Sequence, residues 1–387
     1  MNAMATPLYD LTPAVRLLLT GILVASGPLL MVYLRNLRST PLRRMHALTL
    51  VTLFLTFDLV LFGAFTRLTD SGLGCPDWPG CYGNASPIGA VEEIASAQHA
   101  MPTGPVTQGK AWVEMVHRYL AMAVGVLITA LCVVAWLARR QRSGRGTLHP
   151  AWATATLVWV CIQGAFGALT VTMKLFPAVV TLHLLGGYVL MALLCVQVVH
   201  LGARSAPAQR GTVAYPPRLR WAVAAALVVL MLQATSGAWV STNYAVLACS
   251  EFPLCQGSWW PLMDFARGFE LWRPLGLSQD GSNITFQALT AIHVAHRTLA
   301  LLTLLALGAL AAWMAQTPRL RRAAAWLAAL LALQALTGIA NVVLDWPLLS
   351  AVLHSGGAGA MVVLLTWTLM TVRPVPAVQG ALPGVAA

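Results

Sequence analysis

Nine stretches of the chain are apolar over a length that crosses a lipid bilayer, and this constrains the fold more than any other feature. Of the 387 residues, 58% are hydrophobic and only 9% are charged, which is far from the composition of a soluble domain. We therefore predict an all-α integral membrane protein. The expected spans are 13–34, 47–66, 112–138, 151–172, 179–201, 221–242, 289–315, 323–344 and 349–371.

The formal net charge of +12 reflects topology, because the basic residues are unevenly placed. Of the 24 Lys and Arg residues, 16 lie in alternate connections between the spans, whereas all twelve acids lie in the spans or on the other side. The positive-inside rule places the basic connections in the cytoplasm, the N-terminus outside and the C-terminus inside. We expect no nucleic-acid binding. The basic groups are Arg35 to Arg44, Arg139 to Arg145, Arg204 to Arg220, Arg319 to Arg322, and Arg373.

A short motif occurs twice, each time at the start of an apolar span. The first copy is Glu114, His117 and Arg118, and the second is His293, His296 and Arg297. Residues three apart share one face of a helix, so the first and second members of each copy lie side by side. Each copy is followed by a further histidine in a later span, His183 and His354.

The order of features in the first half of the chain returns in the second. Twelve residues separate Gly63 from Cys75 and Gly237 from Cys249, and twenty separate Gln163 from His183 and Gln334 from His354. Four spans per copy is an even number, so we predict parallel repeats that form two pseudosymmetric four-helix bundles. The expected parts are an extra transmembrane helix with its basic loop (1–46), the first bundle (47–201), a cytoplasmic linker (202–220), the second bundle (221–371) and a cytoplasmic tail (372–387).

Four histidines in this duplicated register favour metal ligation. A lone histidine in a membrane helix is equally explained by an interhelical hydrogen bond. Two imidazoles that face each other across a bundle can hold haem by its axial positions, and an adjacent arginine suits a propionate. The expected ligands are His117, His183, His296 and His354, and the propionate partners are Arg118 and Arg297. We assign no such role to His46, His149 and His200 at cytoplasmic ends or to His99 in an outer loop.

The two halves differ where Glu114 occupies the position of His293. A carboxyl group near a bound porphyrin can act as a general acid or base, and the alternative is that it only orients His117. The difference suggests one working site and one electron-transfer or structural site. Asp58, in the second span, is either a functional carboxyl or a hydrogen-bonded structural one.

Each half also carries two cysteines six residues apart, in a loop on the predicted outer side. Disulfides persist there, so Cys75 with Cys81 and Cys249 with Cys255 can each close a small ring. Each ring is either a structural clip or a redox pair that exchanges electrons with the site below. Cys132, Cys161 and Cys195 lie in spans, where we expect buried apolar packing.

Together, these motifs resemble the haem A synthase family, in the bacterial form that has a cysteine pair in each half. The resemblance rests on residues 66–81 (TRLTDSGLGCPDWPGC), on the motif of Glu114, His117 and Arg118, and on His296, Arg297 and His354, and it covers about residues 47–371. Two features depart from the family pattern. One is the added first helix, and the other is His293, which makes the second-half ligand ambiguous.

The resemblance implies an oxidoreductase that converts haem O to haem A for cytochrome oxidase by oxidising a ring methyl group to formyl. His117 and His183 would flank haem O, Glu114 would serve the chemistry, and His296 and His354 would ligate a haem b cofactor. Four electrons would leave in two rounds, by way of an alcohol and a hydrated aldehyde. The expected setting is the bacterial inner membrane, with lipid and haem O synthase as partners. The electron acceptor and homo-oligomer formation stay open.

Three other functions fit parts of the pattern. A di-haem carrier linked to quinone explains the histidines but neither Glu114 nor the cysteine loops. A thiol oxidoreductase explains the cysteines but not the histidines, and the spacing is not Cys-x-x-Cys. A haem-free transporter built on parallel repeats explains the topology alone.

Overall fold

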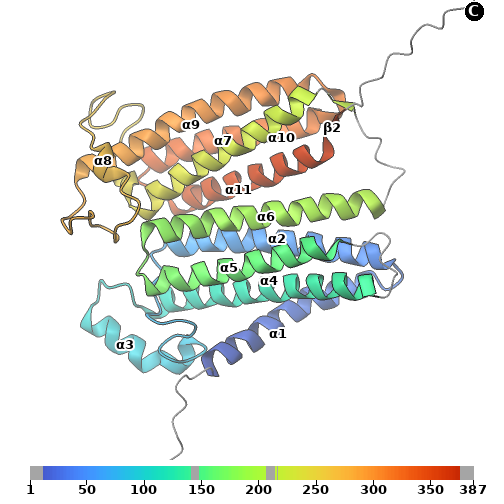
Figure 1. Ribbon diagram of the computed structural model, residues 1–387. Coiled ribbons are helices and arrows are strands. Elements are labelled where there is room, and N and C mark those ends of the chain that lie inside the picture. The colour runs from blue at the N-terminus through green and yellow to red at the C-terminus, as the bar shows by residue number, and fades with distance from the viewer. Residues whose placement is uncertain (1–11, 141–147, 206–213, 216, 375–387) are drawn as a thin grey trace, which may run out of the picture.

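The computed structural model describes residues 12–140, 148–205, 214–215 and 217–374, and it is almost entirely helical (Figure 1). Within this part of the chain, nine helices are long and apolar enough to cross a membrane, which confirms the nine predicted spans and the all-α membrane class. They are α1 (Thr12–Arg35), α2 (Pro41–Leu68), α4 (Gln108–Arg140), α5 (Pro150–Thr172), α6 (Pro177–Ser205), α7 (Pro217–Thr242), α9 (Phe286–Ala315), α10 (Arg321–Val343) and α11 (Leu348–Thr371).

Short elements lie in the connections between these helices. Figure 1 shows α3 and α8 at the same end of the molecule, opposite β2. The acids Glu92 and Glu93 occupy the first turn of α3, where they suit the positive end of the helix dipole. The short elements are η1 (Pro87–Ala90), α3 (Val91–Ala100), η3 (Ala245–Ala248), α8 (Phe265–Gly268), η4 (Pro318–Leu320), and the strands β1 (Ala214–Tyr215) and β2 (Arg373–Pro374), which pair in parallel.

Local sequence explains where several long helices begin. Pro41 and Pro150 occupy the first turns of α2 and α5, where the missing N–H has no helical partner to lose. The side chain of Thr285 accepts a hydrogen bond of 3.2 Å from the backbone N–H of Ala288 and caps α9.

Apart from α1, the long helices pack in two groups of four, and the two groups contact each other. α4 and α6 each pack on both α2 and α5, and α9 and α11 each pack on both α7 and α10. α6 and α2 contact α11, and α6 contacts α7, so the two groups lie side by side (Figure 1). One apolar core runs through both groups and includes Leu194 of α6, Leu327 of α10 and Leu365 of α11, all fully buried.

Helix α1 packs along α4, which carries the first copy of the repeated motif. A Cβ atom on Gly21 would lie 2.6 Å from Cβ of Met122, so only glycine permits this close approach. Leu17 joins an apolar cluster with both cysteines of the first loop and with Met115 of α4. Helix α1 therefore supports the first cysteine loop.

Left-handed backbone occurs at equivalent places in the two halves of the chain. Every non-glycine residue with positive φ in the described ranges has a partner 174 or 171 residues away, which are the offsets of the sequence motifs. The pairs are Asp70 with Tyr244, Tyr82 with Gln256, Lys174 with Asp345, and Leu175 with Trp346.

Candidate functional site

Each half of the chain carries a loop closed by a disulfide. Cys75 is bonded to Cys81 and Cys249 to Cys255, with Cα atoms 4.9 and 4.8 Å apart. All four cysteines are buried. The structure therefore brings together the cysteine pairs that the sequence predicted.

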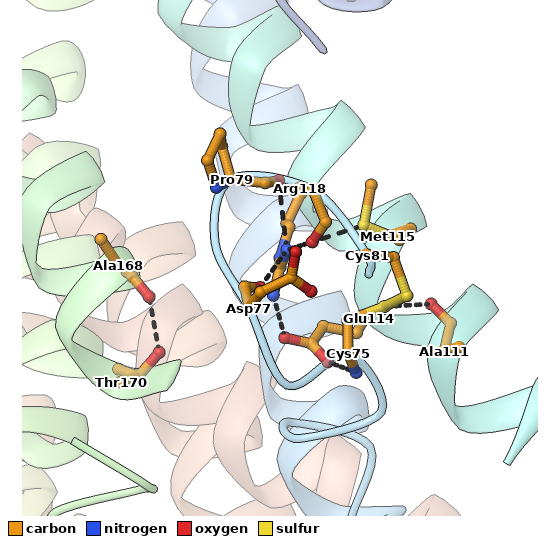
Figure 2. Close-up of polar contacts among 12 residues, drawn as sticks. Cys75, Asp77, Pro79, Cys81, Ala111, Glu114, Met115, Arg118, Ala168 and Thr170 are labelled. Carbon is orange, nitrogen blue, oxygen red and sulfur yellow. Dashed lines mark hydrogen bonds and ion pairs between the residues drawn. A yellow bond between two sulfur atoms is a disulfide. The ribbon is translucent and has the colours of Figure 1, made fainter. Parts of the chain in front are cut away.

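Arg118 attaches the first loop to α4, as Figure 2 shows. Its guanidinium donates hydrogen bonds of 3.1 Å to the backbone carbonyls of Asp77 and Pro79, and a further bond to the carbonyl of Gly80. The same group forms an ion pair with Oε1 of Glu114. Only 8% of Arg118 is exposed, so these partners replace the water that a buried charge loses.

Glu114 joins the helix motif to the cysteine loop. Its Oε2 accepts a hydrogen bond of 2.8 Å from the backbone N–H of Cys75, while Oε1 faces Arg118. The side chain is buried, and both oxygens face N–H donors. Both contacts are ones that carboxyl oxygens accept, so the side chain is held from the loop and from its own helix at once.

Arg297 makes the corresponding contacts in the second half. It donates hydrogen bonds of 3.1 Å to the carbonyl of Cys249 and 3.0 Å to that of Leu254. Its Nε donates a bond of 3.2 Å to Nε2 of His293, which takes the place that Glu114 has in the first half. The structure therefore directs His293 toward the arginine and the second loop.

His117 of α4 and His183 of α6 form the first histidine pair. Both rings are partly exposed. Phe62 of α2 stacks on His117, with ring centroids 6.3 Å apart and planes 14° apart. Nδ1 of His183 is buried and has no hydrogen-bond partner.

His296 of α9 and His354 of α11 form the second pair, and both rings are partly exposed. Nδ1 of His296 lies 2.9 Å from Oγ of Ser236 and 3.1 Å from Nε2 of Gln233. Nδ1 of His354 lies 2.9 Å from Oγ1 of Thr337. The second pair is thus held by polar side chains on neighbouring helices.

A glycine faces each of the four rings. A Cβ atom on Gly63 would lie 3.0 Å from Nε2 of His117, and one on Gly237 would lie 3.0 Å from Cε1 of His296. The corresponding distances to Cε1 are 3.5 Å from Gly167 to His183 and 3.3 Å from Gly338 to His354. The two histidines of each pair therefore lie on two different helices. Both of these helices pack against the same two neighbouring helices, which carry the glycines.

These observations test whether the site fits haem. Two imidazoles from facing helices are a donor set that haem iron accepts. In the described part of the chain, no three His, Cys, Asp or Glu side chains cluster as a metal site. The unpartnered Nδ1 of His183 and the rings seated against glycines are compatible with a group held by each histidine pair.

The ends of α2 and α7 and the segments that follow them also connect the two halves. Arg67 donates a hydrogen bond of 2.5 Å to the carbonyl of Ser241, and the hydroxyl of Tyr244 donates one of 2.6 Å to Asp70. The guanidinium of Arg67 lies 4.2 Å from the centre of the Tyr244 ring. Burial raises the pKa of Tyr244, so its hydroxyl keeps its proton for this bond.

Several other predicted residues lie away from the histidine pairs. Asp58 is partly exposed on α2, and Nδ1 of His149 accepts the backbone N–H of Ala151 at the start of α5. Cys132 and Cys195 are buried as expected. The prediction was wrong for Cys161, which is exposed on α5, because a hydrophobic span directs some of its side chains to lipid rather than to the core.

Sequence reasoning did not single out Gln233, Ser236 or Thr337. The signal was available, since Ser236 and Thr337 directly precede the two second-half glycines that face histidine rings. Phe62 and Phe166 occupy the same place before the first-half glycines.

Comparison with known proteins decides the family. The model of the cytochrome oxidase assembly protein family matches residues 46–368, which include both disulfide loops and both histidine pairs. The chain belongs to this family. A haem A synthase of Shewanella oneidensis is 38% identical over 323 residues, which are 84% of this chain and 94% of that protein. A haem A synthase of Exiguobacterium sibiricum is 27% identical over 65% of this chain and 77% of its own length.

Proposed function

We propose that this chain is a haem A synthase that oxidises a ring methyl group of haem O to formyl. The observation that carries the proposal is the histidine arrangement, in which two pairs lie on facing helices and a glycine faces every ring. The membership in the cytochrome oxidase assembly family and the similarity to haem A synthases support the same reaction.

The two groups of four helices are interpreted as two parallel four-helix bundles, 47–201 and 221–371, that arose by duplication. The matched left-handed residues and the matched contacts between glycines and histidines support this interpretation. The remaining parts are the added helix and loop (1–46), a linker (202–220) and a tail (372–387). The disulfide loops face the outer side of the bacterial inner membrane, with the C-terminus in the cytoplasm.

His117 and His183 would hold the substrate haem O in the first bundle, and His296 and His354 would hold haem b in the second. When bound, haem b supplies a redox centre that accepts electrons from the reaction. The position of His293 against Arg297 favours His296 as the second-bundle ligand. Arg118 and Arg297 stay predicted partners of propionates, although the contacts described above commit much of each guanidinium to loop carbonyls.

Glu114 serves the oxidation from one helical turn before His117. Oxidation of a methyl group to formyl removes four electrons, and with water as the oxygen source it also releases four protons, for which a base near the substrate would serve. Arg118 and the N–H of Cys75 each occupy one lone pair of the carboxylate, which leaves a second lone pair on each oxygen for a proton. Protonation would weaken the ion pair with Arg118 and, through the same carboxyl group, the contact with the cysteine loop. The final electron acceptor and haem O synthase are partners outside the chain, and self-association stays open.

The decisive experiment expresses the chain in a host that makes haem O but no haem A, and identifies the extracted haem by chromatography and mass. We expect a formyl-bearing haem that requires His117 and Glu114. If haem O is recovered unchanged beside a stable b-type spectrum, the synthase function is wrong and the di-haem electron carrier takes its place. Activity that depends on the cysteines but not on the histidines would instead support the thiol oxidoreductase.

A further inference from the structure

The two histidine pairs differ in what contacts the ring nitrogen Nδ1. In the second pair, a hydroxyl group lies 2.9 Å from this atom in both histidines, Ser236 beside His296 and Thr337 beside His354. In the first pair, Nδ1 of His183 is buried without any partner. The two pairs therefore have the same ligand type but different support.

The difference follows from one position in the sequence. Each histidine ring is faced by a glycine, and the residue immediately before that glycine is hydroxylic in the second half and aromatic in the first. Phe62 stacks on His117, whereas Ser236, at the matched position in the second half, contacts Nδ1 of His296. The four dipeptides are Phe62–Gly63, Phe166–Gly167, Ser236–Gly237 and Thr337–Gly338.

Each of these hydroxyl groups also reaches a backbone carbonyl of its own helix. Ser236 Oγ donates a hydrogen bond of 2.8 Å to the carbonyl of Gln233, and Thr337 Oγ1 donates one of 2.6 Å to the carbonyl of Leu333. A hydroxyl has one proton and two lone pairs, so with its proton on the carbonyl it meets the histidine through a lone pair. The proton in that contact then comes from Nδ1.

This arrangement favours the tautomer with the proton on Nδ1 in both rings, and in His296 it requires the amide oxygen of Gln233 to face Nδ1. A neutral imidazole with its proton on Nδ1 has an unprotonated Nε2, which is the form that ligates a metal. A hydrogen bond from the far nitrogen also fixes the ring orientation and makes the ligating nitrogen more basic. The amide of Gln233 can accept from the Nδ1–H of His296 as well, when its oxygen rather than its nitrogen faces the ring.

We propose that Ser236 and Thr337 are positioning residues that lock His296 and His354 as Nε2 ligands and so retain the haem of the second half. This rests on the proposed function, because it takes the second pair as the site of the permanent haem b. The phenylalanines at the matched positions leave His117 and His183 without this support. A histidine pair without hydroxyl partners suits a haem that must enter as substrate and leave as product.

The test measures haem retention and reduction potential, not catalysis. The full-length chain, produced in a host that makes haem b but no haem O, carries Ser236→Ala, Thr337→Val or both. Each protein is prepared with and without His117→Ala, which removes one ligand of the first pair. Transfer of haem to excess apomyoglobin gives the dissociation rate, and a redox titration gives the midpoint potential.

We expect each single variant to lose haem roughly ten-fold faster and the double variant to lose it faster still, since partners of metal-bound histidines contribute about 10- to 100-fold to affinity. The midpoint potential rises, because a less basic imidazole stabilises ferric iron less. Thr337→Ser and Ser236→Thr keep the hydroxyl and restore slow dissociation.

Two matched controls remove a hydroxyl that bonds only its own helix. Thr235 Oγ1 donates to the carbonyl of Met231 at 2.7 Å, and Ser355 Oγ donates to that of Ala351 at 3.2 Å. Thr235→Val and Ser355→Ala therefore leave dissociation and potential unchanged. If Ser236→Ala and Thr337→Val behave like these controls in a protein that binds haem b, the positioning role is wrong while the synthase function stands. If the unsubstituted chain binds no haem, both proposals are wrong.

Discussion

The backbone N–H of Cys75 donates a hydrogen bond of 2.8 Å to Oε2 of Glu114, whose other oxygen pairs with Arg118. The residue one turn before His117 is thus in direct contact with the disulfide-closed loop. A change in the loop therefore reaches the helix that carries His117 through one carboxylate.

Glu114→Gln is expected to retain the haem spectrum but to lower haem A production about 100-fold, the low end of what a general acid or base contributes. An amide keeps one acceptor and adds a donor that conflicts with the N–H of Cys75 or with Arg118. Extracted haem, quantified by mass, measures the effect. Glu92→Gln, in the exposed first turn of α3, is the control. Normal haem A production by the Glu114 variant would remove the carboxylate from the mechanism.

Arg118→Lys is expected to loosen the first loop, because an ammonium group cannot form the several bonds that the guanidinium makes to loop carbonyls and Glu114. Losing one hydrogen bond to a charged group costs about 1.5–3 kcal/mol. The Cys75–Cys81 bond should then be reduced by dithiothreitol at least about ten-fold faster, as measured by alkylation and mass spectrometry. Arg16→Lys, exposed on α1, should have no effect. Equal rates for the two variants would contradict the attachment.

Gly63→Ala is expected to displace His117, because the new methyl group would lie 3.0 Å from Nε2. Gly237→Ala should do the same to His296, and the haem content of the purified protein should fall in both. Gly167→Ala places its methyl at 3.5 Å from His183, an ordinary contact, and Gly125→Ala meets nothing within 4 Å. A loss of haem as large in these last two variants would show that the glycines matter for helix packing rather than for the rings.

Replacing Cys249 and Cys255 by serine tests whether a disulfide is a clip. Closing a ring of this size contributes about 2 kcal/mol in the loop-entropy model. A clip therefore predicts a lower unfolding temperature with most haem A production retained. The same replacement of Cys75 and Cys81 should cost more activity, since that loop also holds Glu114. Complete loss of turnover from the Cys249 and Cys255 variant, with haem content and thermal stability intact, would favour the redox role instead.

Periodicity and spacing were sufficient to predict much of the architecture. A bilayer requires about twenty apolar residues per helical span, so the nine spans could be predicted from composition alone. Matched spacings predicted which histidines and cysteines correspond, and the cysteine pairs are bonded as expected. The exposed Cys161 was missed because apolar composition does not distinguish lipid-facing from core-facing positions.

The sequence by itself determined the membrane class, the long helices and the residue types at the two sites, because these depend on local hydrophobicity and on spacing along one chain. Only the tertiary structure decided which atoms those residues contact. It placed Glu114 against the backbone of the first cysteine loop, and it placed Ser236 and Thr337 against the second histidine pair alone. Such contacts join segments that lie on different elements, and they depend on helix rotation and depth, which hydrophobic periodicity leaves unspecified.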